Sequence, residues 1–370
     1  MFRNHCMPCH GGGGSGPFPL ETYEQVRDRS ELVRFQVLGK TMPPPAPFSD
    51  QGYFSHFQPL NDDQLIKYQV WIRQGKQKGE PFIDAKELPL ADESSGSLTP
   101  ISHENVREEG PRYWKVIKYQ LPNSPIRLSE LRLSPSANTS FRTATIAYFP
   151  KGDPALNQLP VEPDSVFPIP GDQILGTWAP GYDILRFPQN AAPTLPAGGQ
   201  LVVLAQFQPT GKVESADIDV RFSEYQQDNK GNHLRSLTLS NQQFELPAGE
   251  SPIYNLETTM PEAGTILSLI PEARFYCAKI TVKAITPNNK ETLLFDTQRW
   301  DPYWIGNYQF QNEIKLPKGT RILAQFQYNN DEKCAMNEGR TPLPVYSGLG
   351  LQKEVCRLHI KYSADLNGSD

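Results

Sequence analysis

Residues 316–327 read Leu316-Pro317-Lys318-Gly319-Thr320-Arg321-Ile322-Leu323-Ala324-Gln325-Phe326-Gln327, a tight turn followed by a strand-like run. The same unit occurs earlier, where Leu195-Pro196-Ala197-Gly198 leads into Leu204-Ala205-Gln206-Phe207-Gln208. A third tetrad, Leu246-Pro247-Ala248-Gly249, lies between the two. One turn-and-strand unit that recurs in both halves of a chain indicates two similar domains. We expect these domains at residues 101–248 and 249–370.

Further strand-like runs extend outward from these units. In Lys279-Ile280-Thr281-Val282-Lys283-Ala284-Ile285, apolar and polar residues alternate, which places the apolar side chains on one face of a strand. Short strands at regular spacing, without helical patterns between them, predict β-sandwiches. The runs occupy residues 113–119, 143–149, 201–208, 217–222, 279–286, 321–328 and 355–362.

Length and composition agree with several β-rich domains. A chain of 370 residues exceeds one ordinary core, and 35 Pro with 27 Gly suit many short strands and turns. The net charge of −5 gives no reason to expect a nucleic-acid partner. No apolar run approaches the length of a membrane-spanning segment.

The first residues carry a different signal. Cys6-Met7-Pro8-Cys9-His10 is a C-x-x-C-H motif, which is typical of covalent haem attachment. A zinc site and a redox dithiol are the alternatives. Zinc needs a second ligand pair at suitable spacing, and none follows, whereas a dithiol would open a long helix rather than precede the loop 11–16. We therefore expect Cys6 and Cys9 to form thioethers with haem c, and His10 to bind its iron.

A sixth iron ligand is expected from Met42, which lies in Gly39-Lys40-Thr41-Met42-Pro43-Pro44-Pro45. The prolines favour a stiff extended loop that can hold one side chain over a metal. The alternatives are that Met42 only packs in a small core, or that His56 is the ligand.

Two helical patterns surround this loop. Residues 20–39 show mostly helical apolar spacing, and Asn61 is a plausible N-cap for a helix that continues through Ile72. We expect a small all-α haem domain at residues 1–80, followed by a polar linker at 81–100. The predicted fold is thus a small all-α cytochrome c domain followed by two all-β sandwich domains.

The order of these motifs resembles a known family. The haem motif, Pro17–Arg27, Met42-Pro43-Pro44 and the stretch Leu60–Gly75 are similar to the cytochrome c domain that precedes bacterial copper type II, ascorbate-dependent monooxygenase-like (peptidylglycine alpha-hydroxylating monooxygenase-like) proteins. The resemblance implies two jelly-roll-like domains with one copper on each. Similar stretches in the second part are Gly176–Gly181, Gln206–Lys212, Leu269–Arg274, Phe295–Trp300, Tyr308–Phe310, Tyr328–Asn330 and Glu354–Cys356.

The resemblance also identifies the positions of the copper ligands, and none of them carries a ligand here. The family's His-His pair falls on Thr145 and Ile146, and its third His falls on Gln206. Its His-x-His pair falls on Glu272 and Arg274, which we expect to form an ion pair, and its Met falls on Val355. Copper needs imidazole and thioether donors, so we expect copper-free, catalytically degenerate sandwiches.

The remaining histidines and cysteines complete the expectations. His103, His233 and His359 are isolated in sequence, and His359 is expected to face solvent. The resemblance implies a disulfide between Cys334 and Cys356. Cys277 is expected to be a small buried residue.

We interpret the chain as an exported mono-haem c-type cytochrome for electron transfer with a redox partner protein, its sandwiches serving as a docking or structural platform. Haem attachment implies a periplasmic or extracellular location. Because Met1 lies five residues before Cys6, we expect a processed or truncated form, or a late start. The alternatives are an active copper- and ascorbate-dependent monooxygenase and a structural subunit of a larger redox assembly.

Overall fold

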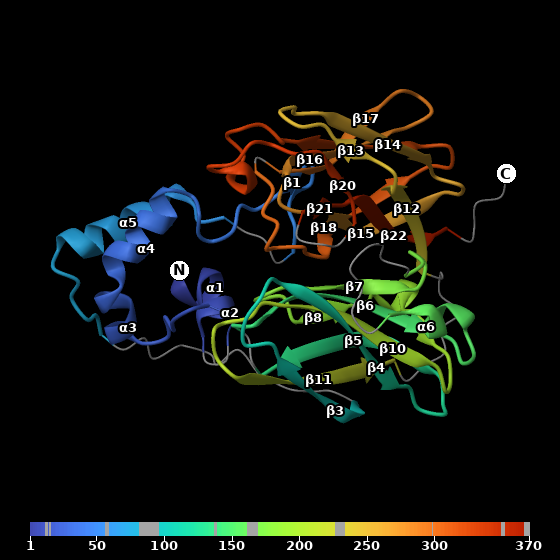
Figure 1. Cartoon of the computed structure of the whole chain (residues 1–370), viewed down its shortest axis with the longest axis horizontal. Helices are drawn as coiled ribbons and strands as arrows, with labels where there is room; N and C mark the ends of the chain where they lie inside the picture. The colour runs from blue at the N-terminus through green and yellow to red at the C-terminus, as the bar shows by residue number, and fades with distance from the viewer. Residues whose placement is uncertain are drawn as a thin grey trace.

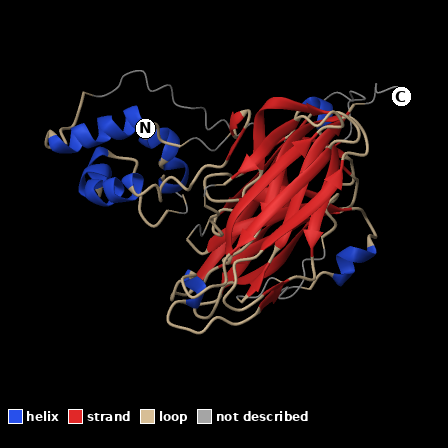
Figure 2. Cartoon of the chain, turned by 90° about the horizontal axis from the view of Figure 1, so that it is seen from above, coloured by secondary structure: helices blue, strands red, loops and turns tan. Residues whose placement is uncertain are grey.

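The chain is predominantly β in a computed structural model, with 45% of residues in strands and 14% in helices. Antiparallel sheets form two packed sandwiches, and a few small helices lie at one end of them (Figures 1 and 2). The structure describes residues 1–11, 14, 16–55, 59–80, 96–136, 139–160, 169–225, 234–297, 299–348 and 352–365.

The first sandwich consists of two facing sheets with strand orders β4-β10-β6-β7 and β3-β11-β5-β8, and β9 pairs with β5. Their inner faces enclose a core that includes Leu128, Phe141 and Phe207. The elements are β3 (Gly96–Val106), β4 (Tyr113–Gln120), β5 (Ile126–Pro135), β6 (Phe141–Phe149), α6 (Pro154–Gln158), β7 (Ile174–Trp178), β8 (Ile184–Arg186), η1 (Gln189–Ala191), β9 (Thr194–Leu195), β10 (Gln200–Phe207) and β11 (Glu214–Glu224).

The second sandwich has sheets β14-β19-β16-β17-β1-β2 and β12-β22-β15-β18, with a small sheet β13-β20-β21 beside them. Strands β12 and β13, which precede residue 249, belong to these sheets. The elements are β12 (Leu234–Asn241), β13 (Glu245–Leu246), β14 (Ile253–Thr259), β15 (Gly264–Glu272), β16 (Cys277–Ile285), β17 (Glu291–Asp296), β18 (Tyr308–Leu316), β19 (Arg321–Tyr328), η2 (Ala335–Asn337), β20 (Val345–Ser347), β21 (Lys353–Glu354) and β22 (Cys356–Ala364).

The repeated Leu-Pro-x-Gly tetrads form turns, as the sequence predicts. Gly198, Gly249 and Gly319 have φ values of 67°, 78° and 81°, a left-handed conformation that favours glycine. These turns precede β10, β14 and β19. The motif therefore precedes one strand of the first sandwich and two neighbouring strands of the second.

The two sandwiches pack against each other through the sheets β4-β10-β6-β7 and β12-β22-β15-β18 (Figure 1). Val202 and Leu204 of β10 share an apolar cluster with Ile270 of β15. The ammonium of Lys361 in β22 donates a hydrogen bond of 3.1 Å to the backbone carbonyl of Gly171 in the first sandwich. The expectation that His359 faces solvent is wrong, because it is only 1% exposed on the same strand.

Short helices are the main regular secondary structure of the first 80 residues. The strands β1 (Phe48–Ser49) and β2 (Gly52–Tyr53) interrupt them, and Phe48 pairs with Asp296 of β17. A capping box at Asn61, whose side chain accepts from the Gln64 amide, starts α5 as predicted. The helices are α1 (Phe2–His5), α2 (Met7–His10), α3 (Tyr23–Asp28), α4 (Ser30–Leu38) and α5 (Asp62–Arg73).

The predicted fold class is therefore wrong. No clear all-α cytochrome domain precedes the sandwiches, since the helices are small and their segment contributes strands to the second sandwich. The physical reason is the small core of this segment, whose apolar cluster has six buried members among the described residues. A core of that size leaves the segment dependent on its neighbours. The cluster consists of Cys6, Leu20, Val26, Val33, Val37 and Tyr68.

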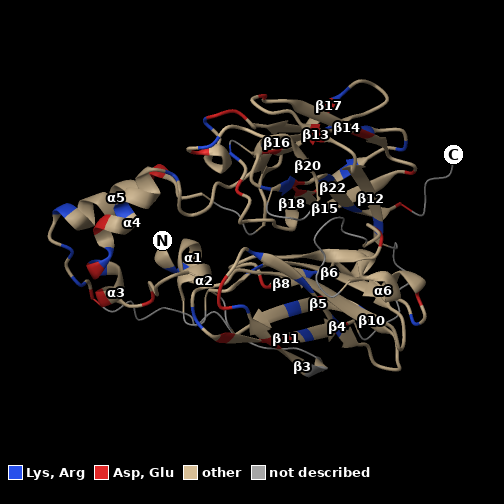
Figure 3. Ribbon diagram, viewed as in Figure 1, with Lys and Arg blue, Asp and Glu red and all other residues tan. Residues whose placement is uncertain are grey.

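Acidic and basic residues are interspersed along the helices and both sandwiches (Figure 3). Among the helices in the described ranges, none is both long and apolar enough to span a bilayer. The predicted linker at 81–100 lies mostly outside the described residues, and β3 already begins at Gly96.

Candidate functional site

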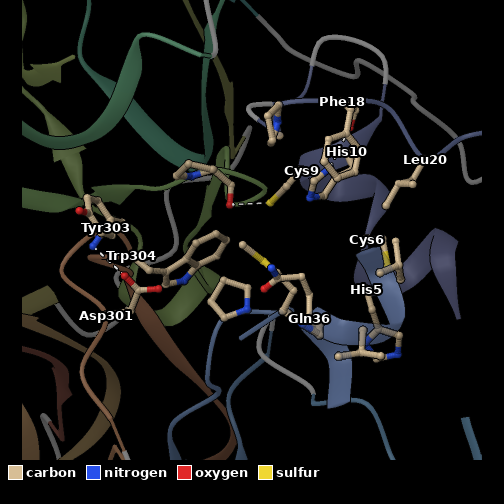
Figure 4. Close-up of a pocket in the computed structure, with 18 of the residues that line it drawn as sticks. His5, Cys6, Cys9, His10, Phe18, Leu20, Gln36, Asp301, Tyr303 and Trp304 are labelled. Atoms are coloured by element: carbon tan, nitrogen blue, oxygen red, sulfur yellow. Dashed lines mark hydrogen bonds between the residues drawn. The ribbon is translucent and has the colours of Figure 1, made fainter. Parts of the chain in front are cut away.

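A cavity of about 480 Å³ lies between the helical segment and one end of the sandwiches (Figure 4). Its volume falls within the roughly 300–1,000 Å³ that is usual for sites of cofactor-sized ligands. Cys6, Cys9, His10 and Met42 all line it. The structure therefore brings together the four residues that the sequence singles out in the first 45 positions.

Two consecutive helical turns position the C-x-x-C-H motif. The α1 helix ends at His5, and α2 begins at Met7 with Pro8 in its first turn. The amides of Cys9 and His10 donate to the carbonyl of Cys6 at 3.1 and 2.8 Å. This turn, and not a long helix, fixes the spacing of the two thiols and the imidazole.

A hydrogen bond fixes the orientation of His10. Its Nδ1 lies 2.8 Å from the backbone carbonyl oxygen of Phe18, and the two rings are 5.0 Å apart between centroids. A carbonyl oxygen can only accept, so Nδ1 carries the proton and donates it. The lone pair of the neutral imidazole is then on Nε2, which is the atom available to a metal.

The two thiols have different surroundings. Burial raises the pKa of the Cys6 thiol to about 11, whereas reactive cysteines in dithiol oxidoreductases have a lowered pKa. Cys9 Sγ lies 3.3 Å from the backbone carbonyl of Pro180, which belongs to the first sandwich. The motif is thus in direct contact with the first sandwich. The raised pKa of Cys6 gives no support to the alternative of a redox dithiol.

Met42 follows a turn after α4. Thr41 donates its amide to the Gln36 carbonyl at 3.0 Å, and Lys40 has a φ of 52°. The Met42 side chain is 46% exposed, so it contributes little to a packed core. Ligation by Met42 stays a prediction. The rival ligand, His56, lies outside the described residues.

These residues fit haem c by their chemistry and surroundings. The site combines two thiols at the attachment spacing with an imidazole that presents Nε2. Leu20, Val33 and Val37 give the helical side an apolar wall suited to the faces of a porphyrin. The residues present therefore suit the expected group.

Residues from the sandwiches also line the cavity, and no local sequence pattern marks them. They come from distant loops and strands that meet only in the folded chain. Asp301 accepts a hydrogen bond of 2.9 Å from the Tyr303 amide, and burial raises the pKa of its carboxyl. The contributors are Arg112, Arg142, Pro180, Asp301, Tyr303 and Trp304.

In the first sandwich, the expected copper positions lie on two different faces. Thr145 pairs with Leu204, and Gln206 with Thr143, so Thr145 and Gln206 share the face that packs on the second sandwich. Ile146 belongs to the internal core. The absence of copper stays a prediction.

In the second sandwich, Glu272 lies beside Arg357 on the neighbouring strand, and Arg357 Nε donates to its carboxylate at 2.6 Å. The expected partner of Glu272 was Arg274, so that prediction is wrong. Burial lowers the pKa of the Arg274 guanidinium. Val355 lies between β21 and β22 and packs at the contact between the sandwiches.

The predicted disulfide between Cys334 and Cys356 is not formed, since both are free thiols. Cys334 precedes the turn η2 and Cys356 begins β22, and both are buried in the core of the second sandwich. Cys277 is 6% exposed, which confirms that it is a small buried residue.

No protein-family model matches the chain, and no curated protein matches it. Among solved structures, PNGF-II is similar with a TM-score of 0.35 and 8% identity, over 73% of this chain and 66% of PNGF-II. A latent PorU from Porphyromonas gingivalis has a TM-score of 0.19 and 9% identity, over 71% of this chain and 25% of PorU. A two-domain protein of unknown function from Bacteroides fragilis has a TM-score of 0.20 and 8% identity, over 82% of this chain and 99% of that one. At these TM-scores the likenesses carry no argument about function.

Proposed function

We propose that the chain is a mono-haem c-type cytochrome that transfers single electrons to or from a redox partner protein. The observation that carries the proposal is the convergence of Cys6, Cys9, His10 and Met42 on one cavity, with the His10 ring held by Phe18. The proposal places the haem between the helical segment and the sandwiches. Covalent attachment at this motif takes place outside the bacterial cytoplasm, so the proposed location is periplasmic or extracellular.

Each residue has a separate role in the proposal. Cys6 and Cys9 tether the porphyrin through thioethers, which prevents its loss. His10 presents Nε2 to one face, because Nδ1–H is engaged by Phe18. Met42 would supply a thioether sulfur as a further iron donor. When bound, the haem iron supplies one-electron oxidation and reduction.

The test is covalent haem content. The chain is produced in a host with a c-type haem maturation pathway, then analysed by haem staining on a denaturing gel and by intact mass. We expect one attached haem in the wild type and none in Cys6→Ala/Cys9→Ala. Cys334→Ala is the matched control, because this thiol lies outside the cavity, and it should retain the haem. A wild-type chain without covalent haem, beside a fully loaded reference cytochrome, would overturn the proposal.

Metal analysis separates this function from the copper enzyme. We expect stoichiometric iron without copper. Stoichiometric copper together with ascorbate-dependent hydroxylation would instead support a monooxygenase.

A structural subunit, with the haem as a folding staple, is the second candidate. Its support is that the helical segment contacts both sandwiches, through the Cys9–Pro180 hydrogen bond and the pairing of Phe48 with Asp296. Stopped-flow electron exchange with a small c-type cytochrome distinguishes the two. Fast exchange supports the carrier, whereas a haem that stabilises the chain without exchanging electrons supports the staple.

A further inference from the structure

Two arginines of the first sandwich line the cavity that contains Cys6 and His10. Arg112 immediately precedes β4, and Arg142 lies in β6. The Nε atoms of both donate to the same side-chain oxygen of Gln208, at 2.9 and 3.1 Å. Two positive charges are thus held side by side by one neutral acceptor.

The charges of this pair are not balanced by a bonded carboxylate. Within the described residues, neither Arg112 nor Arg142 forms an ion pair, and Nη1 of Arg112 is buried without a hydrogen-bond partner. Burial, and then the nearby charge of Arg142, lowers the pKa of the Arg112 guanidinium. A buried cation with an unbonded N–H costs free energy unless an anion meets it.

Aromatic rings hold the Arg112 guanidinium in place. Its Cζ lies 4.2 Å from the ring centroid of Tyr303 and 5.6 Å from that of Phe275. Stacking fixes the plane of a guanidinium and leaves the N–H groups at its edge able to bond a carboxylate. Arg112 is therefore positioned before any ligand binds, which reduces the entropy lost on binding.

The cavity has an apolar side and a cationic side. Leu20, Val33 and Val37 of the helical segment form the apolar side, and the two arginines belong to the cationic side. A porphyrin of the haem c type is an apolar disc that carries two carboxylates on its periphery. Two guanidiniums match these carboxylates in number and in charge, and such charge-assisted hydrogen bonds are among the strong ones.

We infer that Arg112 and Arg142 bind the two carboxylates of the porphyrin tethered at Cys6 and Cys9. This inference rests on the proposed function and extends it, because it makes the first sandwich part of the haem site. Asp301 lines the same cavity, and its charge opposes that of the arginines. Positive charge near the iron favours the reduced state, so loss of either arginine lowers the midpoint potential.

The experiment compares Arg112→Gln and Arg142→Gln with Arg221→Gln. Arg221 lies in β11 of the same sandwich, outside the cavity, and its replacement changes the net charge equally. Potentiometry on haem-loaded protein should give a lower midpoint potential for the two cavity variants than for wild type and Arg221→Gln. Resonance Raman bands of the porphyrin carboxylates should shift in the same two variants only.

The arms of the experiment give distinct outcomes. If wild type carries no covalent haem, the proposed function fails. If haem is attached but both cavity variants match Arg221→Gln in potential and in the carboxylate bands, only the present inference fails. Arg112→Lys and Arg142→Lys keep the charge and lose the paired N–H groups, so they should restore part of the potential but not the bands. They also carry the test if a Gln variant does not fold.

Arg112 and Arg142 could instead bind a free carboxylate or phosphate ion from solution. It is tested by titrating wild type with acetate and with phosphate at constant ionic strength. We expect no change in the midpoint potential or in the carboxylate bands. A saturable change that disappears in Arg112→Gln would mean that the pair binds a free anion, and would overturn the assignment to the porphyrin.

Discussion

Gly16 lies directly against the imidazole of His10: a Cβ atom added to Gly16 would come within 2.5 Å of His10 Nδ1. That distance is too short, so one of the two residues must move if Gly16 is replaced. The Nδ1 atom is the same one that bonds the Phe18 carbonyl. A small change at Gly16 is therefore a direct test of how His10 is oriented.

Gly16→Ala should displace the His10 ring and weaken its hydrogen bond to Phe18. We expect a loss of about 1–3 kcal/mol in the free energy of unfolding from overpacking, and a partial loss of the low-spin haem spectrum. Thermal unfolding and absorption spectra of the loaded protein measure the two effects. Gly79→Ala is the control, since an added Cβ there meets nothing within 4 Å. Identical spectra for both variants would contradict this account.

Met42→Ala should separate a ligand from a packing residue. Because Met42 is 46% exposed, its truncation should change the free energy of unfolding by only about 0.5 kcal/mol. Its loss as an iron ligand should nevertheless abolish the Met-ligated low-spin spectrum of the reduced protein. Met336→Ala, in the second sandwich, should leave that spectrum unchanged. Survival of the spectrum in Met42→Ala would assign the sixth position to another group.

Gly181→Ala should disturb the contact between the haem motif and the first sandwich. A Cβ on Gly181 would lie 2.7 Å from Cys9 Sγ, and Gly181 has a φ of 76°. Gly211 has a φ of 77° with nothing within 4 Å, so Gly211→Ala reproduces only the backbone strain of about 1–2 kcal/mol. Hydrogen exchange of residues 6–10 should rise in Gly181→Ala alone. Equal exchange in both variants would mean that this contact does not hold the motif.

Glu272→Ala should be strongly destabilising, because it leaves the Arg357 guanidinium buried and without its carboxylate. Removing one member of a buried pair costs about 3–5 kcal/mol in the free energy of unfolding. Glu272→Met/Arg357→Met should recover most of this loss. Denaturant unfolding provides the measurement, and Glu291→Ala, at the exposed Lys283–Glu291 pair, should cost no more than about 1 kcal/mol. A small effect of Glu272→Ala alone would show that the pair is not isolated from water.

Glu354 should make stability depend on pH. Burial raises the pKa of its carboxyl to about 7 from an ordinary value of 4.5. Hydrogen bonds of 2.8 Å from the amides of Tyr276 and Val355 lower this pKa, but burial has the larger effect. Its contribution is fully present below pH 4.5 and is lost as the pH rises through 7. The loss amounts to about 3 kcal/mol.

Denaturant unfolding of wild type, Glu354→Gln and the exposed control Glu313→Gln across pH 4.5–7.5 checks this prediction. The decline in stability should be shallower in Glu354→Gln and unchanged in the control. A pH-independent difference between Glu354→Gln and wild type would rule out titration of Glu354 in this range.

The sequence predicted features that depend on neighbouring residues. The N-cap at Asn61 and the turns at Gly198, Gly249 and Gly319 depend on a few adjacent positions, and all are present. The strand-like run at residues 355–362 is also present, as β22.

Features that depend on distant residues were missed or misread. A period of two separates the faces of β22, but it does not say whether the polar face meets water or another sheet, so His359 was misplaced. Strand β1 has two residues and no detectable pattern, and its pairing with β17 overturns the separate all-α domain. Arg112 and Arg142 both bond Gln208 at the cavity, and Arg112 also stacks on Tyr303, residues that lie far away in sequence.

The pairing of Phe48 with Asp296 has a mechanical consequence. His10 adjoins Cys9, which is bonded to the first sandwich, whereas Met42 lies six residues before Phe48, which is bonded to the second. The two expected iron ligands are thus anchored to different bodies. A change in the angle between the sandwiches would pull His10 and Met42 apart or press them together. A movement of the β-sheets would then change the absorption spectrum and the midpoint potential of the proposed iron site.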